Sequence, residues 1–263
     1  MAEDIYPLSI DGLKTPLSMF VHDQRDQHVS KGIAENGVWE AYETQLVIER
    51  LQAGDVFIDV GANIGYYSVL ASQLVAATGR IYSFEPDPNN FALLEKNVAL
   101  NNLKNIECFN VALSDRDGEG ELFLNSHNFG DHQIYDDGSG RDSFAIALRN
   151  GSQLLAAEKN IRLIKIDTQG AEFQVLSGLL ALLKQQTGPL SLIIEFWPYG
   201  LKKSGASATQ VLDLLLSLQL PLSIIDHLGH SLIACTEQQL RDWVAMMADH
   251  PDDEGFMNIL VGS

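Results

Sequence analysis

VFIDVGANIG, residues 56–65, is the stretch that decides the fold of this chain. Its first three residues form an apolar run typical of a buried strand, and Asp59 ends that run. Gly61 and Gly65 follow in a short turn, and residues 66–79 have the pattern of a helix. A strand, a glycine turn and a helix expose backbone N–H groups at the start of the helix, where a ligand can contact them. The stretch therefore predicts a ligand-binding turn.

Asn63 occupies the middle of this turn and narrows the choice of ligand. Dinucleotide sites have glycine at this position because the pyrophosphate touches the backbone there, and an Asn side chain would crowd it. Asn still tolerates left-handed backbone angles, so the turn itself is preserved. The spacing resembles the D-x-G-x-G-x-G turn of class I S-adenosylmethionine methyltransferases, with Asn63 in place of one glycine. An ordinary strand-to-helix turn is the alternative that an isolated glycine pair leaves open.

The rest of the chain alternates apolar segments with segments of helical spacing. The strands expected after the turn are residues 80–84, 106–113, 162–166, 190–194, 222–225, 231–234 and 256–261. This alternation predicts an α/β fold, with a mainly parallel sheet and helices on both faces. Ligands of such sheets lie beyond the carboxyl ends of the strands. The polar residues at those ends should therefore line one cleft: Asp59, Glu85, Asn110, Asp167 and Glu195.

Composition limits the partners. The 263 residues include 17 basic and 35 acidic ones, and the formal net charge is −18. Such a surface repels phosphate backbones and anionic bilayers, so we expect neither nucleic acid nor a membrane as a partner. The N-terminus lacks a basic region followed by an apolar one, so no signal peptide is expected. These features favour a cytoplasmic protein.

Two regions are expected along the chain, and the second contains an insert. Residues 1–36 should form an N-terminal extension packed on the core, and residues 37–263 the main domain. Within that domain, residues 116–160 are rich in Gly, Asp, Asn and Ser. A long polar loop in a compact domain is more often functional or mobile than inert. We expect this insert to act as a lid that sets the choice of substrate.

Five runs of sequence occur in the order found in one protein family. They are IDVGANIGYYS, FEPDPNNFALLEKNVALNN, NVALSD, LIKIDTQGAEFQVLSG and LIIEF. Over roughly residues 37–197 the chain resembles the FkbM family of S-adenosylmethionine-dependent methyltransferases. The resemblance implies the Rossmann-like class I methyltransferase fold, with a seven-stranded sheet whose last strand is antiparallel. It also implies O-methylation of natural products or glycans, with S-adenosylmethionine as the cofactor.

The resemblance also implies a set of cofactor-binding residues. They are Glu40, Asp59, Gly61, Ala62, Asn63, Gly65, Tyr66, Glu85, Pro86, Asn110, Val111 and Ala112. Glu85 should accept hydrogen bonds from both ribose hydroxyls, and Glu40 should lie near the methionine end of the cofactor. The run from Asp167 to Glu172 matches the family's IDVEGAE, but Thr168 and Gln169 replace Val-Glu, so one acid is lost.

Methyl transfer to a hydroxyl requires a positioned acceptor and a base, and no metal is intrinsically needed. His132 is the first candidate base because imidazole titrates near neutral pH. Asp167 is the second candidate and Glu195 the third. Together with Asp131 these residues could instead hold a divalent metal, but they lack the spacing of metal ligands, so none is expected.

The leading hypothesis is an O-methyltransferase of the EC 2.1.1 type that acts on a natural product. The acceptor is either a sugar or polyketide hydroxyl or a peptide carboxylate, which needs no strong base. Two other classes remain open: an NAD-dependent oxidoreductase, disfavoured by Asn63, and a non-catalytic regulator that keeps the cofactor pocket. Besides the small-molecule or peptide acceptor, a second copy of the chain in a homodimer is the partner considered.

Overall fold

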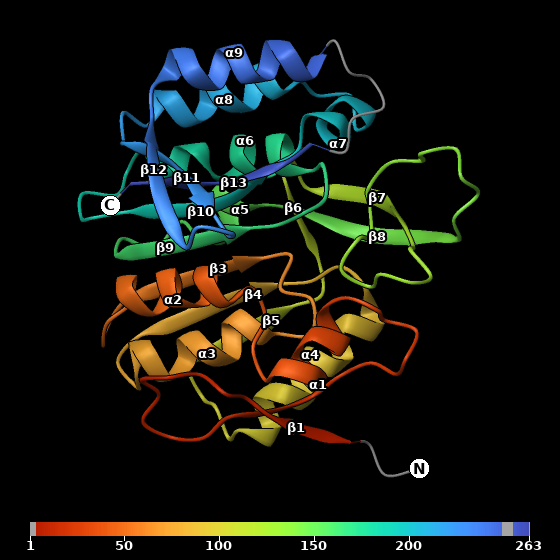
Figure 1. The fold of residues 1–263 in the computed structure, drawn as a ribbon, viewed down its shortest axis with the longest axis vertical. Helices are drawn as coiled ribbons and strands as arrows, with labels where there is room; N and C mark the ends of the chain where they lie inside the picture. Colours follow the sequence, from red (N-terminus) through yellow and green to blue (C-terminus); the bar gives the residue numbers. More distant parts are fainter. Residues whose placement is uncertain (1–3, 249–254, 263) are drawn as a thin grey trace.

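A computed structural model describes residues 4–248 and 255–262 of the chain, so residues 1–3, 249–254 and 263 of the two predicted regions lie outside it. Its centre is a sheet that has eight strands in the described residues, in the order β12-β11-β13-β10-β9-β3-β4-β5 (Figure 1). The strands are β3 (Val56–Val60), β4 (Arg80–Phe84), β5 (Ile106–Phe109), β9 (Ile161–Ile166), β10 (Ser191–Phe196), β11 (Leu222–Asp226), β12 (Ser231–Cys235) and β13 (Met257–Val261).

The direction of the strands confirms the predicted fold class. β5, β4, β3, β9 and β10 pair in parallel, and β13 runs antiparallel to both β10 and β11. This is the mainly parallel sheet with an antiparallel last strand that the sequence predicts. β12 matches the strand expected at residues 231–234 and pairs antiparallel with β11, which gives the sheet one strand more than the seven that the family resemblance implies.

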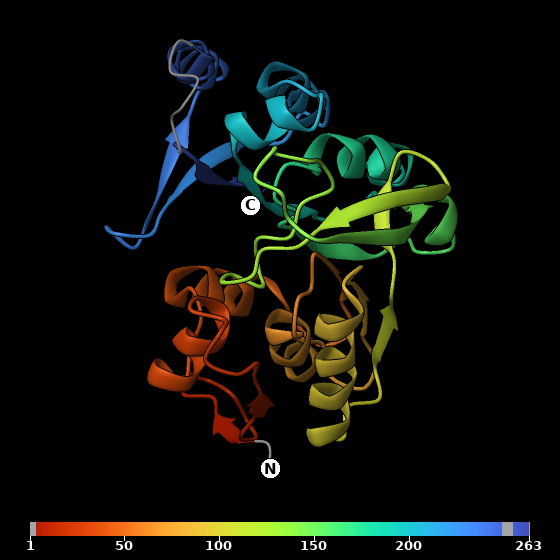
Figure 2. The ribbon, with the colours of Figure 1, turned by 90° about the vertical axis from the view of Figure 1, so that its right-hand side faces the viewer.

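Helices cover both faces of the sheet, as Figures 1 and 2 show. One side carries α1 (Val29–Asn36), α2 (Ala41–Arg50), α3 (Tyr66–Val75) and α4 (Pro88–Leu100). The other side carries α5 (Gly151–Leu154), α6 (Glu172–Leu183), α7 (Pro198–Lys203), α8 (Ala208–Ser217) and α9 (Glu237–Ala248). Neighbouring residues of a strand point to opposite faces. Leu163 of β9 accordingly packs in the core with α2 and α3, and Ile164 in the core with α6 and α8.

Two expected elements end earlier than the sequence pattern indicated. The helix expected over residues 66–79 ends at Val75, because Ala76 has φ 54° and ψ −171° and cannot continue it. The strand expected over residues 106–113 stops at Phe109. Its second half becomes β6 (Ala112–Ser114), which leaves the central sheet and pairs in parallel with a strand of the insert.

The insert builds a small sheet of its own beside the central one (Figure 2). β7 (Gly118–Phe123) and β8 (Ser143–Asn150) pair antiparallel, and the sheet order is β6-β8-β7. Leu122, Ile146 and Leu148 form a separate apolar cluster between them. The loop between β7 and β8 returns to the sheet once, where Phe123 and Gln133 form an isolated bridge.

The N-terminal segment lies against α4. β1 (Ile5–Pro7) and β2 (Ser18–Phe20) form an antiparallel pair. The side-chain amide of Asn97 accepts the N–H of Phe20 at 2.7 Å and donates to its carbonyl at 3.0 Å. Asn101 holds Ser18 in the same way. Within the described residues, no helix combines the length and the apolar character needed to cross a membrane.

Candidate functional site

A cavity of about 1440 Å³ opens at the carboxyl ends of β3, β4, β9 and β10. All three predicted catalytic residues and most of the predicted cofactor-binding residues line it. These lining residues are Glu40, Gly61, Ala62, Asn63, Tyr66, Glu85, Pro86, Val111, Ala112, His132, Asp167 and Glu195. The chain thus brings residues from both ends of the sequence and from the insert to one place.

The turn after β3 is held tightly between neighbouring elements. Gly61, Asn63 and Gly65 all have left-handed backbone angles, with φ of 82°, 51° and 88°. A Cβ atom on Gly61 would lie 1.9 Å from the carbonyl oxygen of Asp167. A Cβ atom on Gly65 would lie 2.4 Å from a methyl carbon of Leu94. The glycines are therefore required by contacts within the protein, in addition to any ligand.

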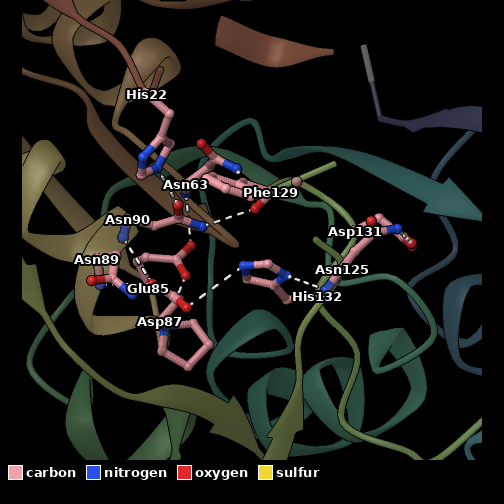
Figure 3. Close-up of polar contacts among 12 residues, drawn as sticks. His22, Asn63, Glu85, Asp87, Asn89, Asn90, Asn125, Phe129, Asp131 and His132 are labelled. Carbon is pink, nitrogen blue, oxygen red and sulfur yellow. Dashed lines mark hydrogen bonds and ion pairs between the residues drawn. The ribbon is translucent and has the colours of Figure 1, made fainter. Parts of the chain in front are cut away.

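Asn63 does not point into the space over the turn, and its side chain instead ties the turn to the insert (Figure 3). Its Nδ2 donates to the carbonyl oxygen of Phe129 at 3.1 Å, and Asn90 donates to the same oxygen at 2.9 Å. His22 hydrogen-bonds to Asn90 at 2.7 Å, and its ring lies edge-on to that of Phe129. We call residues 125–132 the cap segment, because these contacts hold it over the cofactor turn.

Glu85 is the polar group at the end of β4. Its carboxylate accepts the backbone N–H of Asn63 at 2.8 Å and that of Asp87 at 2.9 Å. Only 5% of the residue is exposed, and burial raises the pKa of Glu85 to about 8 despite these hydrogen bonds. Each carboxylate oxygen keeps a second lone pair. Because Glu85 lines the cavity, those lone pairs can accept hydroxyl groups of a ligand.

Three predicted cofactor-binding residues, Asp59, Gly65 and Asn110, are not among the residues that line the cavity. Asp59 is buried and accepts the hydroxyl of Ser68 at 2.5 Å, and burial raises its pKa to about 6. Asn110 donates to the carbonyl oxygens of Glu85 and Pro86 at 2.8 and 3.0 Å. Asn110 thus holds two residues that line the cavity.

His132 lines the cavity, but both of its ring nitrogens face protein groups (Figure 3). Nδ1 accepts the backbone N–H of Asn125 at 3.0 Å. In the neutral ring Nε2 therefore carries the hydrogen, and it faces Asp87 Oδ2 at 3.6 Å. Burial lowers the pKa of His132. The Nδ1 lone pair that a base would use thus already accepts a hydrogen bond from the cap segment. Through Nε2 and Asp87, the ring connects the cap segment to the residues that follow β4.

A buried lysine that no sequence motif marked, Lys165, also lines the cavity. Lys165 Nζ is 3.0 Å from Asp167 Oδ2, 3.4 Å from Glu43 Oε2 and 3.8 Å from Glu40 Oε2. It also lies over the ring of Tyr67, 4.8 Å from its centroid. Burial alone would lower the pKa of Lys165, but the carboxylates raise it well above its ordinary value. A lysine inside the apolar run IRLIKI is the sequence signal that could have identified it.

The carboxylates around Lys165 have distinct environments. Glu40 has a left-handed φ of 42° and accepts the hydroxyl of Tyr67 at 2.8 Å. Burial, and then the charge of Glu43, raise the pKa of Glu40 to about 7. Glu43 is fully buried, hydrogen-bonds to the side chain of Asn258 and lies 3.3 Å from His227 Nε2. The hydrogen bond between His227 and Glu43 raises the pKa of His227.

Asp167 and Glu195 lie next to each other on neighbouring parallel strands, because the residues before them, Ile166 of β9 and Ile194 of β10, are paired. Asp167 accepts Lys165 and, at 2.9 Å, the side-chain amide of Gln169. Gln169 thus supplies a hydrogen-bond donor at the position where the family's IDVEGAE run has a glutamate. Burial, and then the charge of Asp167, raise the pKa of Glu195 well above its ordinary value. Its Oε2 has no hydrogen-bond partner among the described residues.

No group of three or more His, Cys, Asp or Glu side chains within residues 4–248 and 255–262 is arranged to hold a metal ion. Carboxylates, amides and hydroxyls line the cavity. Two groups of residues that line the cavity differ in their chemistry. Backbone amides of the turn and Glu85 suit a nucleoside, whereas Asp167 and Glu195 suit proton transfer.

Comparison with known proteins adds a family match to this geometry. Residues 59–219 match the model of the Methyltransferase FkbM domain. A probable cobalt-precorrin-6B C(15)-methyltransferase (decarboxylating) of Sulfolobus acidocaldarius is 37% identical over 79 residues. That alignment covers 30% of this chain and 38% of the relative, so the match spans well under half of the relative's length.

Solved structures of methyltransferases are similar to this one at low identity. The precorrin-6y C5,15-methyltransferase of Geobacter metallireducens has a TM-score of 0.47 and 12% identity, covering 93% of this chain and 98% of its own. Fibrillarin of Aeropyrum pernix, solved with S-adenosyl-L-methionine, has a TM-score of 0.47 and 10% identity, covering 85% and 76%. A TM-score below 0.5 marks a distant likeness, so the acceptor has to be argued from this chain's own residues.

Proposed function

The chain belongs to the FkbM methyltransferase domain family, and from this premise we propose that it binds S-adenosylmethionine and methylates a hydroxyl oxygen of a natural-product acceptor. One observation carries the proposal. A single cavity is lined by the left-handed residues Gly61 and Asn63 of the turn, by the buried hydrogen-bond acceptor Glu85, and by Glu195, one oxygen of which has no partner within residues 4–248 and 255–262.

The residues present fit the cofactor. The turn offers a concave backbone with space for a ligand, since the Asn63 side chain is turned away toward Phe129. Glu85 provides two oxygens with free lone pairs for ribose hydroxyls. When bound, S-adenosylmethionine supplies a methyl group on a positively charged sulfonium. Glu40 and Asp167, which also line the cavity, favour a cationic ligand electrostatically.

Glu195 has the features of the base better than His132 does. A general base works best when its pKa lies near the working pH, and burial raises the pKa of Glu195 in that direction. Its buried Oε2 has no hydrogen-bond partner in the part of the chain that the structure describes, whereas His132 uses Nδ1 to accept the backbone N–H of Asn125. We therefore assign to Glu195 the removal of the acceptor's proton. Asp167, held by Lys165, orients the acceptor beside it.

The charges of the cavity favour a hydroxyl over a carboxylate acceptor. Asp167 and Glu195 both line the cavity on the side that we assign to the acceptor, and an anionic acceptor would meet the charge of Asp167 and, whenever Glu195 is ionised to act as a base, that of Glu195 as well. Lys165 does not offset this repulsion, because three carboxylates already surround it. The same argument, together with the net charge of −18, disfavours a nucleic acid.

Two measurements test the proposal. Equilibrium dialysis with radiolabelled S-adenosylmethionine and with NAD should show binding of the first alone, and binding of NAD would support the oxidoreductase instead. Transfer of the labelled methyl group to alcohols, compared with the matching carboxylic acids, then tests the acceptor. Cofactor binding without transfer to any acceptor would favour a non-catalytic regulator.

A further inference from the structure

The outer edge of β12 is an exposed apolar surface. β12 is the last strand of the central sheet and pairs with β11 alone among the described strands. Its Leu232 and Ile233 are 37% and 49% exposed, and Leu228 in the preceding turn is 98% exposed. Residues 227–236 contain no Asp, Glu, Lys, Arg or Pro, although 20% of the chain is charged. Soluble proteins usually protect a free strand edge with charge or proline, and this edge lacks both.

Other edge strands of this chain do carry such protection. β7 contains Glu119 and Glu121, and β5 contains Glu107. β1 ends at Pro7, which has no N–H to donate to a further strand. The unprotected edge of β12 is therefore a particular feature of this strand and does not reflect a general lack of charge at the sheet edges.

Contacts with α2 hold the β11–β12 hairpin in place. Figure 2 shows the hairpin projecting from the rest of the ribbon. In its turn, His230 stacks on Tyr42 of α2, with ring centroids 5.6 Å apart. His227 Nε2 lies 3.3 Å from Glu43 Oε1 of the same helix. The strand is thus fixed although its edge is exposed, so pairing it with another strand costs little conformational entropy.

The backbone of β12 has two residues that face the open edge. In an antiparallel sheet, alternate residues direct their N–H and C=O groups to opposite sides. The carbonyl of Pro221 accepts the N–H of the residue that follows β13, at 2.9 Å. Alternation along β11 then directs Ile224 toward β12, where it pairs with Ile233. Ile233 therefore faces β11, and its neighbours Leu232 and Ala234 direct their backbone groups outward.

These two outward-facing residues can pair with their own copies. When two copies of β12 lie antiparallel about a twofold axis at Ile233, Leu232 of each copy is opposite Ala234 of the other, and the two exchange N–H···O=C bonds. The two Ile233 side chains meet at the axis. Each copy carries a net charge of −18, so charged surfaces of two copies repel each other. A contact through an uncharged strand keeps that repulsion small.

We propose that two copies of this chain associate through β12 into a twofold dimer, in which the two eight-stranded sheets join at their β12 edges. The assembly is closed, because the pairing uses the unprotected edge of both copies. The contact is small, so we expect a concentration-dependent equilibrium with a dissociation constant of about 1–100 µM. The inference does not depend on the cofactor or on the methyl acceptor.

Sedimentation equilibrium of the full chain, from about 1 to about 300 µM, measures the association. We expect a monomer–dimer equilibrium whose dissociation constant falls as NaCl is raised from about 20 to about 300 mM, because salt screens the repulsion between two acidic copies. A chain that stays monomeric at the highest concentration, or that forms species larger than a dimer, overturns the proposal. A dissociation constant that rises with salt would indicate ion pairs at the contact and would also contradict it.

Ile233→Lys tests the contact, with Ile5→Lys as the matched control. Ile5 is 50% exposed and lies in another edge strand, β1, which Figure 1 shows far from β12. Ile233→Lys places two like charges opposite each other at the axis and should raise the dissociation constant at least about tenfold. Ile5→Lys makes the same change of net charge and should leave the constant within about twofold of the parent's. Equal effects of the two variants contradict the assignment to β12.

Disulfide formation tests the register of the two strands, in a chain that also carries Cys235→Ser. Ile233→Cys should oxidise to a covalent dimer, because Cα atoms of a non-hydrogen-bonded antiparallel pair are about 4.5 Å apart, within the range that a disulfide spans. Ala234→Cys is the control, since its own copy lies diagonally across the axis, about 7–8 Å away. Absence of cross-linking in Ile233→Cys, or equal cross-linking in both variants, overturns the pairing at Ile233.

Discussion

Replacing Glu85 by Gln separates cofactor binding from fold stability. The Glu85 carboxylate accepts two backbone N–H groups, from Asn63 and Asp87, and faces the cavity with its remaining lone pairs. A carboxamide has one oxygen, so its NH₂ end must face either an N–H group of the protein or a ribose hydroxyl. Above a pH of about 8, where Glu85 is ionised, loss of hydrogen bonds to this charged acceptor costs about 1.5–3 kcal/mol, or roughly 12- to 160-fold in affinity for S-adenosylmethionine.

Isothermal titration calorimetry with S-adenosylmethionine measures this loss, and Asp59→Asn is the matched control. Asp59 is a buried carboxylate at the end of the adjacent strand β3, but it bonds to Ser68 and does not line the cavity. The control should lower Tm and leave the dissociation constant within about twofold of the parent's. If Glu85→Gln binds the cofactor as tightly as the parent, Glu85 does not contact the ribose and the cofactor lies elsewhere.

Further predictions concern pH, the base, the cap segment and the buried lysine. The pKa of Glu85 is raised from 4.5 to about 8, so its contribution to the free energy of unfolding is complete below pH 4.5 and is lost as the pH rises through 8. Thermal melts of the ligand-free protein should therefore show Tm falling from pH 5 to 8, with a flatter profile in Glu85→Gln. Glu195→Gln should lower kcat by about 10²- to 10⁴-fold with unchanged cofactor affinity in single-turnover assays, and an active variant would remove Glu195 as the base. His132→Ala should keep kcat within a few-fold but speed cofactor dissociation about 2- to 12-fold in stopped-flow experiments, whereas a collapse of kcat would restore His132 as the base. Lys165→Met leaves three carboxylates without their cation and should lower the free energy of unfolding in urea by about 3–5 kcal/mol; a loss below about 1 kcal/mol would contradict the buried ion-pair cluster.

The parts of the site that the sequence predicted are those built by local chain geometry. The turn from Gly61 to Gly65 follows a strand and begins a helix, and each of these signals is contained in about twenty consecutive residues. Glu85 was predicted for the same reason, because it ends the next strand along the chain. Both line the cavity as expected. Their assignment to the cofactor stays a prediction until binding is measured.

The parts that the sequence did not indicate depend on contacts between distant segments. Glu43 and Lys165 are 3.4 Å apart, although they are separated by more than a hundred residues, and the spacing of α2 shows only an amphipathic helix. The role of His132 depends on the backbone N–H of Asn125 and on Asp87, which lies in another element. The residue type suggested that His132 is a base, but only the geometry shows that its Nδ1 lone pair already accepts a hydrogen bond.

The insert's separate sheet has a consequence for how this protein can diverge. Leu122, Ile146 and Leu148 pack among themselves, apart from the two clusters that stabilise the central sheet. Substitutions in residues 133–142, which follow the cap segment in the loop between β7 and β8, therefore change the lining of the cavity while leaving the two main clusters intact. Duplicated copies of such a gene can change this lining by drift within those ten residues. The same partition makes residues 133–142 a suitable region for randomised libraries, in which most members would still fold and still carry the cofactor turn.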